Sequence, residues 1–264
     1  MLSVRSFLVR GLLAGLVAGF VAFGVAYAMG EPSIEAAIAI EESAGGHAHA
    51  EGTGQAAAED ATGTQVPRSL QSTAGLLTAT AVAGTTLGGL IGVLSALALG
   101  RFGAIGVRGT TLLVTGIGFV SLYVLPFVAY PPSPPAVGSA ETIGTRTTLY
   151  LATVAISVIA AVAAVLVGRR LALRIGAWWA TLAGIAGYLL VGLAAIALLP
   201  AYDEVPAGFP ASVLYAFRTG SFVTSLALWA VLGVVLAELA HRLVRAPVQT
   251  TKTDPAAGHD AVLT

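Results

Sequence analysis

Cysteine is absent from this 264-residue sequence, and methionine occurs only at Met1 and Met29. The absence of thiols excludes a disulfide framework and thiolate metal sites. A metal ion handled by this chain must therefore be held by oxygen and imidazole ligands. Such ligands suit harder or borderline divalent ions better than copper(I).

Charge is also scarce, because only 10% of the residues are charged while 56% are apolar, and the formal net charge is zero. Soluble domains carry about 25% charged residues, so a soluble domain is excluded. A neutral chain is not expected to bind nucleic acid. The sequence also lacks a phosphate-binding loop, an activated nucleophile and a pair of catalytic carboxylates, so we do not expect an enzyme or a tightly bound cofactor.

Long apolar runs make up most of the remaining sequence. A helix of about 20 apolar residues crosses a hydrocarbon core of about 30 Å. The runs predict an all-α, polytopic transmembrane bundle of about six spans in residues 1–245, followed by a flexible cytoplasmic tail at 246–264. The predicted spans are 8–29, 73–99, 110–130, 147–168, 177–199 and 220–240. Ala26-Tyr27-Ala28 resembles a signal-peptide cleavage site, but the first apolar run is longer than a signal peptide requires.

Positive charge is concentrated on one side of this arrangement, which predicts the orientation of a multi-pass cell-membrane protein with both termini in the cytoplasm. The cytoplasmic segments would hold Arg5, Arg10, Arg101, Arg108, Arg169, Arg170, Arg174, Arg242, Arg245 and Lys252. The external segments would hold Arg68, Arg146 and Arg218 together with most of the acids. His241 and His259 fall on the cytoplasmic side and are assigned no role.

Two sets of small residues lie inside the predicted spans. Glycines recur every fourth residue at Gly11, Gly15 and Gly19 and again at Gly84, Gly88 and Gly92. Such stripes favour close helix packing within the chain or in a homo- or hetero-oligomer, and a glycine-lined permeation path is the alternative. Hydroxyl side chains could line a path or bond to backbone carbonyls, and they are Thr78, Thr80, Thr85, Thr86, Ser95, Thr115 and Ser121.

The long external loop, residues 30–72, contains acids and histidines that could collect cations. Glu31-Pro32 resembles a helix start, and a short helix to Glu42 would place Glu31, Glu35 and Glu42 near one face. His47 and His49 follow, and they are interpreted either as incidental polar residues or as a weak metal tether. Residues 45–66 have no apolar period, so we expect them to be mobile. The acids themselves are either a solvated face or a mouth that concentrates cations.

A second group of charged residues lies in the shorter external loops. Asp203 and Glu204 precede Pro206, so they serve either in a turn or at the mouth of the last two spans. Arg146 and Arg218 are external cations, which we expect to pair with Glu141, Asp203 or Glu204 as a loop staple or a gate. If the bundle brings the first and fifth spans together, Glu31, Glu35, Asp203 and Glu204 would gather cations at one external entrance.

Several loop segments together resemble the CbtA family, which is described as the membrane subunit of a cobalt transporter. The segments are GEPSIEAAIAIEE at 30–42, YPPSPPAVG at 130–138, TIGTRT at 142–147, and DEVPAGFP at 203–210 with Phe217-Arg218. The resemblance extends from the first span to about Arg242. Loop matches of this length are far more specific than apolar runs.

This resemblance implies a membrane protein involved in cobalt uptake, with cobalt or another divalent ion as cargo and a small membrane partner of the CbtB type. Two functional hypotheses follow. The first is a divalent-cation transporter subunit that collects ions at Glu31, Glu35, Glu42, His47, His49, Asp203 and Glu204. The second is a non-transporting scaffold or accessory subunit of a larger membrane complex.

The predicted orientation can be tested with accessibility labels, since the chain has no cysteine of its own. Single cysteines at Ala57 and Gly208 are expected to react with an impermeant reagent from outside, and one at Ala172 only from inside. Reaction of Ala172→Cys from outside would overturn the whole arrangement.

Overall fold

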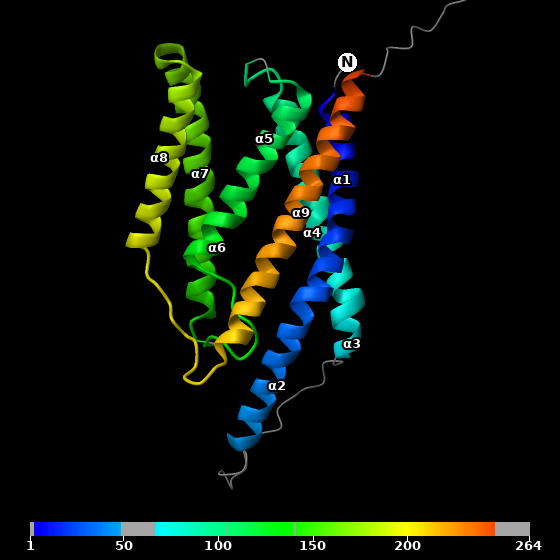
Figure 1. Cartoon of the computed structure of the whole chain (residues 1–264), viewed down its shortest axis with the longest axis vertical. Helices are drawn as coiled ribbons and strands as arrows, with labels where there is room; N and C mark the ends of the chain where they lie inside the picture. Colours follow the sequence, from blue (N-terminus) through cyan, green and yellow to red (C-terminus); the bar gives the residue numbers. More distant parts are fainter. Residues whose placement is uncertain (1–2, 49–66, 104, 140, 246–264) are drawn as a thin grey trace, which may run out of the picture.

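The computed structural model describes residues 3–48, 67–103, 105–139 and 141–245. Every regular element in these ranges is helical, and six continuous helices are long and apolar enough to cross a membrane. Figure 1 shows them side by side along one axis. The predicted all-α transmembrane bundle is therefore confirmed.

Three of the six long helices are built from several segments. The first comprises α1 (Val4–Val25), the π-helical turn η1 (Ala26–Gly30) and α2 (Glu31–Ala48); the second comprises α3 (Arg68–Leu70), η2 (Gln71–Gly75) and α4 (Leu76–Ala98). The third comprises α5 (Val107–Phe119), η3 (Val120–Val124) and α6 (Leu125–Ala129). The last three are the single helices α7 (Ile143–Ile175), α8 (Ala177–Leu198) and α9 (Ala211–Arg245).

Consecutive long helices run in opposite directions, so the bundle has two ends with different connections (Figure 1). The terminal end holds the start of α1, the turn after α4, Gly176 between α7 and α8, and the end of α9. The loop end holds α2, α3 and the connections 130–142 and 199–210. Both ends of the described chain thus lie together, and the assignment of the terminal end to the cytoplasm stays a prediction.

The two glycine stripes pack against each other along α1 and α4. A Cβ added to Gly15 would lie 2.0 Å from the Gly84 carbonyl oxygen, and one added to Gly88 would lie 2.2 Å from the Gly11 carbonyl oxygen. Only glycine permits such backbone contact. The stripes are buried within the chain, so they line no path between α1 and α4. Of the two expected uses of the stripes, the structure shows packing within the chain, and oligomerisation stays a prediction.

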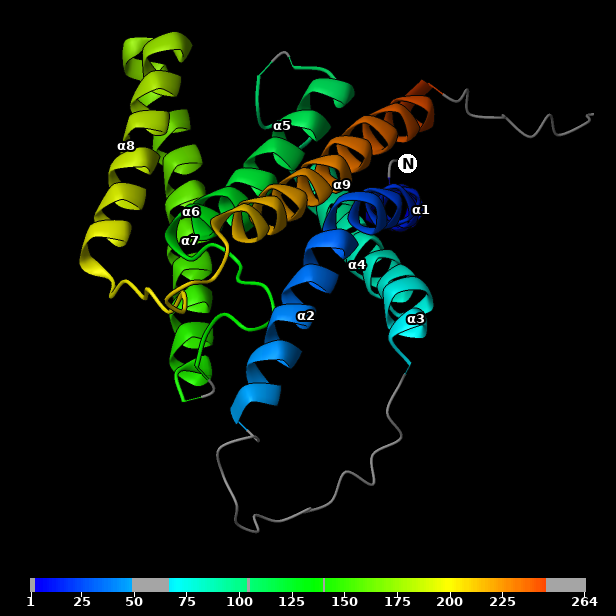
Figure 2. The same cartoon turned by 60° about the horizontal axis from the view of Figure 1, so that its bottom comes forward.

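Proline explains two of the π-helical turns. Pro32 and Pro126 have no N–H to donate to the carbonyl four residues earlier. Just before each proline, the backbone amide bonds to the carbonyl five residues earlier instead of four. The Glu31 amide donates to the Ala26 carbonyl oxygen, and the Leu125 amide donates to the Val120 carbonyl oxygen. The helix therefore bends without ending. Figure 2 shows α2 leaving the line of α1.

This continuity corrects the predicted external loop. We expected a separate helix from Glu31 to Glu42 and a mobile segment at 45–66, whereas α1 continues through η1 into α2 as far as Ala48. The second long helix likewise begins at Arg68, before the predicted start at residue 73. The rest of the predicted mobile segment and the predicted tail at 246–264 lie outside the described residues.

The hydrophobic core lies where α9 crosses α1, α4 and α5. Ala14, Ala18 and Ala22 lie on a face of α1 adjacent to its glycine stripe, and they share a buried cluster with Ile91, Leu228, Trp229, Leu232 and Leu236. The small side chains on α1 thus leave space in which the large side chains of α9 pack. At Gly118, an added Cβ would lie 2.9 Å from Trp229, so α5 also packs tightly on α9.

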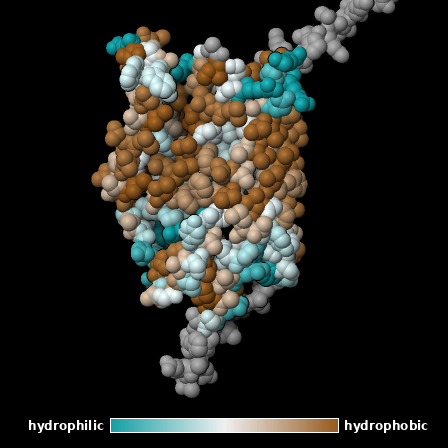
Figure 3. Space-filling model, in the orientation of Figure 1, coloured by the Kyte–Doolittle hydropathy of each residue, from teal (hydrophilic) through white to brown (hydrophobic). Residues whose placement is uncertain are grey.

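Helices α7 and α8 form a hairpin that packs on the third long helix. The Tyr188 hydroxyl lies 2.8 Å from Ser157 Oγ and donates to the Val120 carbonyl oxygen at 3.4 Å, which joins the hairpin to η3. Much of α8 is exposed, including Trp178 and Trp179 at its start. Figure 3 shows a broad apolar band with polar residues gathered at both ends, the surface expected of a bilayer-spanning bundle.

The seam between α1 and α4 predicts a large effect of one methyl group. Gly88→Ala should destabilise the protein by roughly 1–3 kcal/mol, because its Cβ would overlap the α1 backbone. Gly116→Ala is the matched control, since its Cβ would meet no atom within 4 Å. Thermal unfolding in detergent measures both. Equal stability of the two variants would contradict the backbone contact.

Candidate functional site

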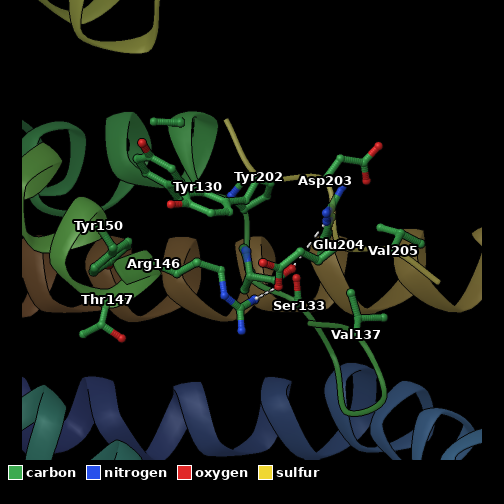
Figure 4. A pocket seen from close by; sticks show the side chains of 14 residues that line it. Tyr130, Ser133, Val137, Arg146, Thr147, Tyr150, Tyr202, Asp203, Glu204 and Val205 are labelled. Carbon is green, nitrogen blue, oxygen red and sulfur yellow. Dashed lines mark hydrogen bonds and ion pairs between the residues drawn. The ribbon is translucent and has the colours of Figure 1, made fainter. Parts of the chain in front are cut away.

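A pocket of about 340 Å³ lies at the loop end, where four segments distant in sequence meet. It is bordered by residues 129–133 and Val137, by residues 146–150 in the first part of α7, by residues 202–205 and by Arg218 on α9. Figure 4 shows side chains from these segments pointing toward one another. Its polar lining consists of Tyr130, Ser133, Arg146, Thr147, Tyr150, Tyr202, Asp203, Glu204 and Arg218.

Local sequence explains how the two loops reach each other. The proline-rich run after α6 has no regular structure, because proline cannot continue a helix. The Tyr130 hydroxyl donates to the Pro200 carbonyl oxygen at 2.8 Å, which ties this run to the loop before α9. Gly138 has a φ of +114°, and an added Cβ would lie 2.6 Å from Arg146 Nη1. Glycine at this position therefore permits Arg146 to lie against the turn.

Glu204 is held by several groups from the facing loop. Its Oε2 lies 3.4 Å from Arg146 Nη1 and accepts from the Ser139 amide at 2.9 Å. The Thr142 side chain, the Ser139 amide and the positive charge of Arg146 lower the pKa of Glu204. The carboxylate is thus kept ionised and joins the two loops. This is one of the ion pairs that the sequence predicted for Arg146.

The other predicted residues of these loops are placed differently. Asp203 is exposed, and in Figure 4 its carboxylate points away from Arg146. Arg218 Nε donates to the Pro132 carbonyl oxygen at 3.4 Å, and no ion pair of Arg218 is found among the described residues. The Glu141 amide donates to Ser139 Oγ at 3.2 Å, and its side chain likewise forms no ion pair in the described part of the chain.

Glu31 forms a second ion pair at the loop end, with Arg68 at the start of α3. Glu31 is only 7% exposed, although it follows directly on an apolar span. Glu35 and Glu42 lie exposed on the outer part of the same helix. His47 falls within α2, but its side chain and the whole of His49 lie outside the described residues.

These positions bear on the predicted collecting site. Within the described ranges, no three His, Asp or Glu residues are grouped closely enough to hold a metal ion. Glu31 and Glu204 instead occupy separate ion pairs, with Arg68 and Arg146. The single entrance formed by Glu31, Glu35, Asp203 and Glu204 is therefore not assembled in this structure.

Most of the candidate path hydroxyls bond to their own helices. Thr78, Thr80, Thr115 and Ser121 donate to carbonyls three or four residues earlier. Ser95 differs, because its hydroxyl is buried and has no hydrogen-bond partner among the described residues. These bonds favour the helix-bonding interpretation over a hydroxyl-lined path for those four residues.

Sequence reasoning missed one acidic residue, Glu238 on α9. Its carboxylate accepts hydrogen bonds from Arg242 and from Arg108 on α5, which links two helices at the terminal end. A signal was present, because Glu238, His241 and Arg242 have the spacing that places residues on one helix face. Glu238 lies at the terminal end, whereas the predicted site residues with carboxylates all lie at the loop end.

The lowered pKa of Glu204 predicts a pH-dependent loop end. Above its unfolded pKa of about 4.3, ionised Glu204 stabilises the folded loops, and this contribution is lost as the pH falls through the lowered folded value. A spin label at Ala207→Cys should therefore become more mobile as the pH falls below about 4. Glu204→Gln should abolish that response, and the control Asp203→Asn should keep it. An unchanged response in Glu204→Gln would contradict the assignment.

One known protein family matches nearly the whole bundle. A family model described as "Probable cobalt transporter subunit (CbtA)" matches residues 4–241, from the first turn of α1 nearly to the end of α9. Comparisons with curated proteins and with solved structures gave no match. The matched region contains every segment that forms the loop-end pocket. Because the match covers most of the sequence, this chain belongs to the CbtA family of cobalt transporter subunits.

Proposed function

We propose that this chain is the membrane subunit through which cobalt enters the cell, and that the ion first meets the protein at the loop-end pocket. The observation that carries this proposal is the convergence of three of the four family-like loop segments, 130–138, 142–147 and 203–210 with Arg218, on one polar pocket. The family description supports transport rather than catalysis, and the word "subunit" implies a partner. By the charge bias of the loops, the pocket faces outward.

Exposed carboxylates near the pocket provide the first attraction. Asp203 lies on the pocket wall, and Glu35, Glu41 and Glu42 are exposed on α2 at the same end of the bundle. A surface that carries only negative charges raises the local concentration of cations. Oxygen ligands also suit a hydrated divalent ion. Asp203 is the acid best placed to meet an ion, because it lies at the pocket and forms no ion pair with a described residue.

Glu204 takes part only if its present partners move. Its oxygens already receive the Ser139 amide and the Arg146 guanidinium, so an entering ion competes with Arg146 for the carboxylate. Of the two external arginines expected to act as a loop staple or a gate, Arg146 is thus the one that competes with the ion for a carboxylate. When an ion displaces Arg146, the tie between the two loops is released, which couples ion arrival to loop movement.

The path onward does not run between α1 and α4, where backbones touch. The remaining passage involves the surfaces of α5, α7 and α9, or a surface shared with the partner subunit. We infer a small membrane partner, of the CbtB type that the family resemblance implies, as part of the working transporter.

Cobalt uptake by proteoliposomes tests this proposal. Vesicles with the purified chain, alone and with its co-expressed membrane partner, are given radiolabelled cobalt, with nickel and magnesium as competitors. Asp203→Asn should lower the initial uptake rate at low salt by roughly tenfold, because local attraction of the cation is lost. Glu141→Gln is the control, an exposed external acid that does not line the pocket.

The paired and exposed acids of α2 should behave differently. Glu31→Gln should lower thermal stability, because it leaves Arg68 unpaired, while Glu35→Gln should affect uptake without loss of stability. Unchanged uptake in folded Asp203→Asn and Glu35→Gln would contradict the external carboxylates as the first contact. Absence of uptake even with the partner present would contradict transport itself.

A further inference from the structure

A carboxylate and an imidazole lie side by side at the terminal end of α9. Glu238 and His241 are three residues apart, so they project from the same face of the helix. The Glu-x-x-His spacing is one that helical bundles use to hold divalent metals in their interiors. Besides partial burial, the charges of Arg108 on α5, of Arg245 and of Glu238 all act on His241, so the imidazole lies near the Arg108–Glu238 ion pair.

Two arginines donate hydrogen bonds to the Glu238 carboxylate. Arg242 Nε donates to Glu238 Oε1 at 2.8 Å, and Arg108 Nη2 donates to Oε2. Arg242 belongs to the same helix, whereas Arg108 belongs to the first turn of α5. Glu238 therefore closes α9 onto α5 at the terminal end.

Near the same end of the bundle, three buried polar atoms have no hydrogen-bond partner among the described residues. Thr111 and Ser95 are both fully buried, and the hydroxyl oxygen of each has no hydrogen-bond partner in the described structure. His241 Nε2 is buried and unpaired in the same sense. An unsatisfied buried polar group usually costs about 1–3 kcal/mol, so three of them near one end of a bundle call for an explanation.

Helix packing places Thr111 of α5 against α9, at the level of the residue before Glu238. Thr115 packs at Gly233, where its Cγ2 would lie 3.1 Å from an added Cβ. One helical turn nearer the terminal end, Thr111 on α5 comes level with Ala237 on α9, beside Glu238. Thr111 also follows Arg108 by three residues, so both project toward α9.

We propose that Glu238 and His241, with the Thr111 hydroxyl, form an inner site for a divalent transition-metal ion. The proposal rests on the transport function inferred above and adds the place where the ion leaves. Carboxylate and neutral imidazole are suitable ligands for cobalt(II). Arg108 and Arg242 occupy Glu238 until the ion displaces them, which opens the contact between α5 and α9. With few protein ligands the site binds weakly, as release requires.

Histidine content permits a direct test, because the chain has only four histidines. Replacing His47, His49 and His259 with Gln leaves His241 as the sole imidazole in a tag-free chain. Cobalt K-edge X-ray absorption of this protein in detergent should show imidazole ligation, and the further change His241→Gln should remove it. Absence of the imidazole signal from the sole-histidine protein would overturn the inner site.

Titration calorimetry of cobalt binding to the sole-histidine protein should show that two substitutions change the affinity in opposite directions. Glu238→Gln should weaken cobalt binding by about tenfold, and Arg242→Gln should strengthen it, because a competitor for the carboxylate is removed. Arg174→Gln is the control, an exposed cation in the last turn of α7, at the same end of the bundle, that forms no ion pair in the described structure. Monodisperse elution confirms folding of each variant. Unchanged binding in Glu238→Gln, or weaker binding in Arg242→Gln, would overturn the proposal.

These measurements separate the inner site from transport. Cobalt binding is measured on the purified chain, with no gradient and no partner. Imidazole ligation without uptake would overturn the transport proposal and keep the metal site, whereas uptake without imidazole ligation would overturn only the inner site.

Discussion

Backbone contact between α1 and α4 is the constraint on which the rest of the bundle depends. Each glycine of one stripe lies against the backbone of the other helix, so the two helices approach more closely than side chains would allow. The alanines on the adjacent face of α1 then leave room for Leu228, Trp229, Leu232 and Leu236 of α9. Helix α9 in turn supports α5 through Gly118 and Trp229. These four helices form a closed packing unit, to which the α7–α8 hairpin is joined through η3.

The ion pairs of the described residues lie at the two ends of the bundle. At the loop end, Glu204 joins two loops around a pocket, and at the terminal end Glu238 joins α5 to α9. In both places a carboxylate bridges two segments and is neutralised by arginine. A divalent ion carries more charge than an arginine, and carboxylate oxygens can replace the waters that it sheds, so it can compete with arginine for the carboxylate. Each ion pair is thus both a structural tie and a contact that a cation can replace.

The sequence predicted the helices well, because long apolar runs and glycine periodicity are local signals. The Arg146–Glu204 pair was also within reach, since topology placed both residues outside the membrane on neighbouring loops. The Glu31–Arg68 pair could not be predicted, because a long segment separates the two residues and no local sequence pattern specifies its path. Continuation of α1 into α2 was missed because Pro32 was interpreted as a helix start, although a π-helical turn accommodates it within one helix. Glu238 was missed because its meaning depends on Arg108 of another helix.

We propose that this CbtA-family chain handles cobalt at its two polar ends and not within the glycine seam. Anomalous diffraction at the cobalt edge, from crystals of the lipid-reconstituted protein soaked with cobalt, tests this directly. We expect anomalous density beside Asp203 at the loop-end pocket and beside Glu238 and His241 at the terminal end. Density between α1 and α4, or ordered cobalt only at sites remote from both carboxylates, would contradict it.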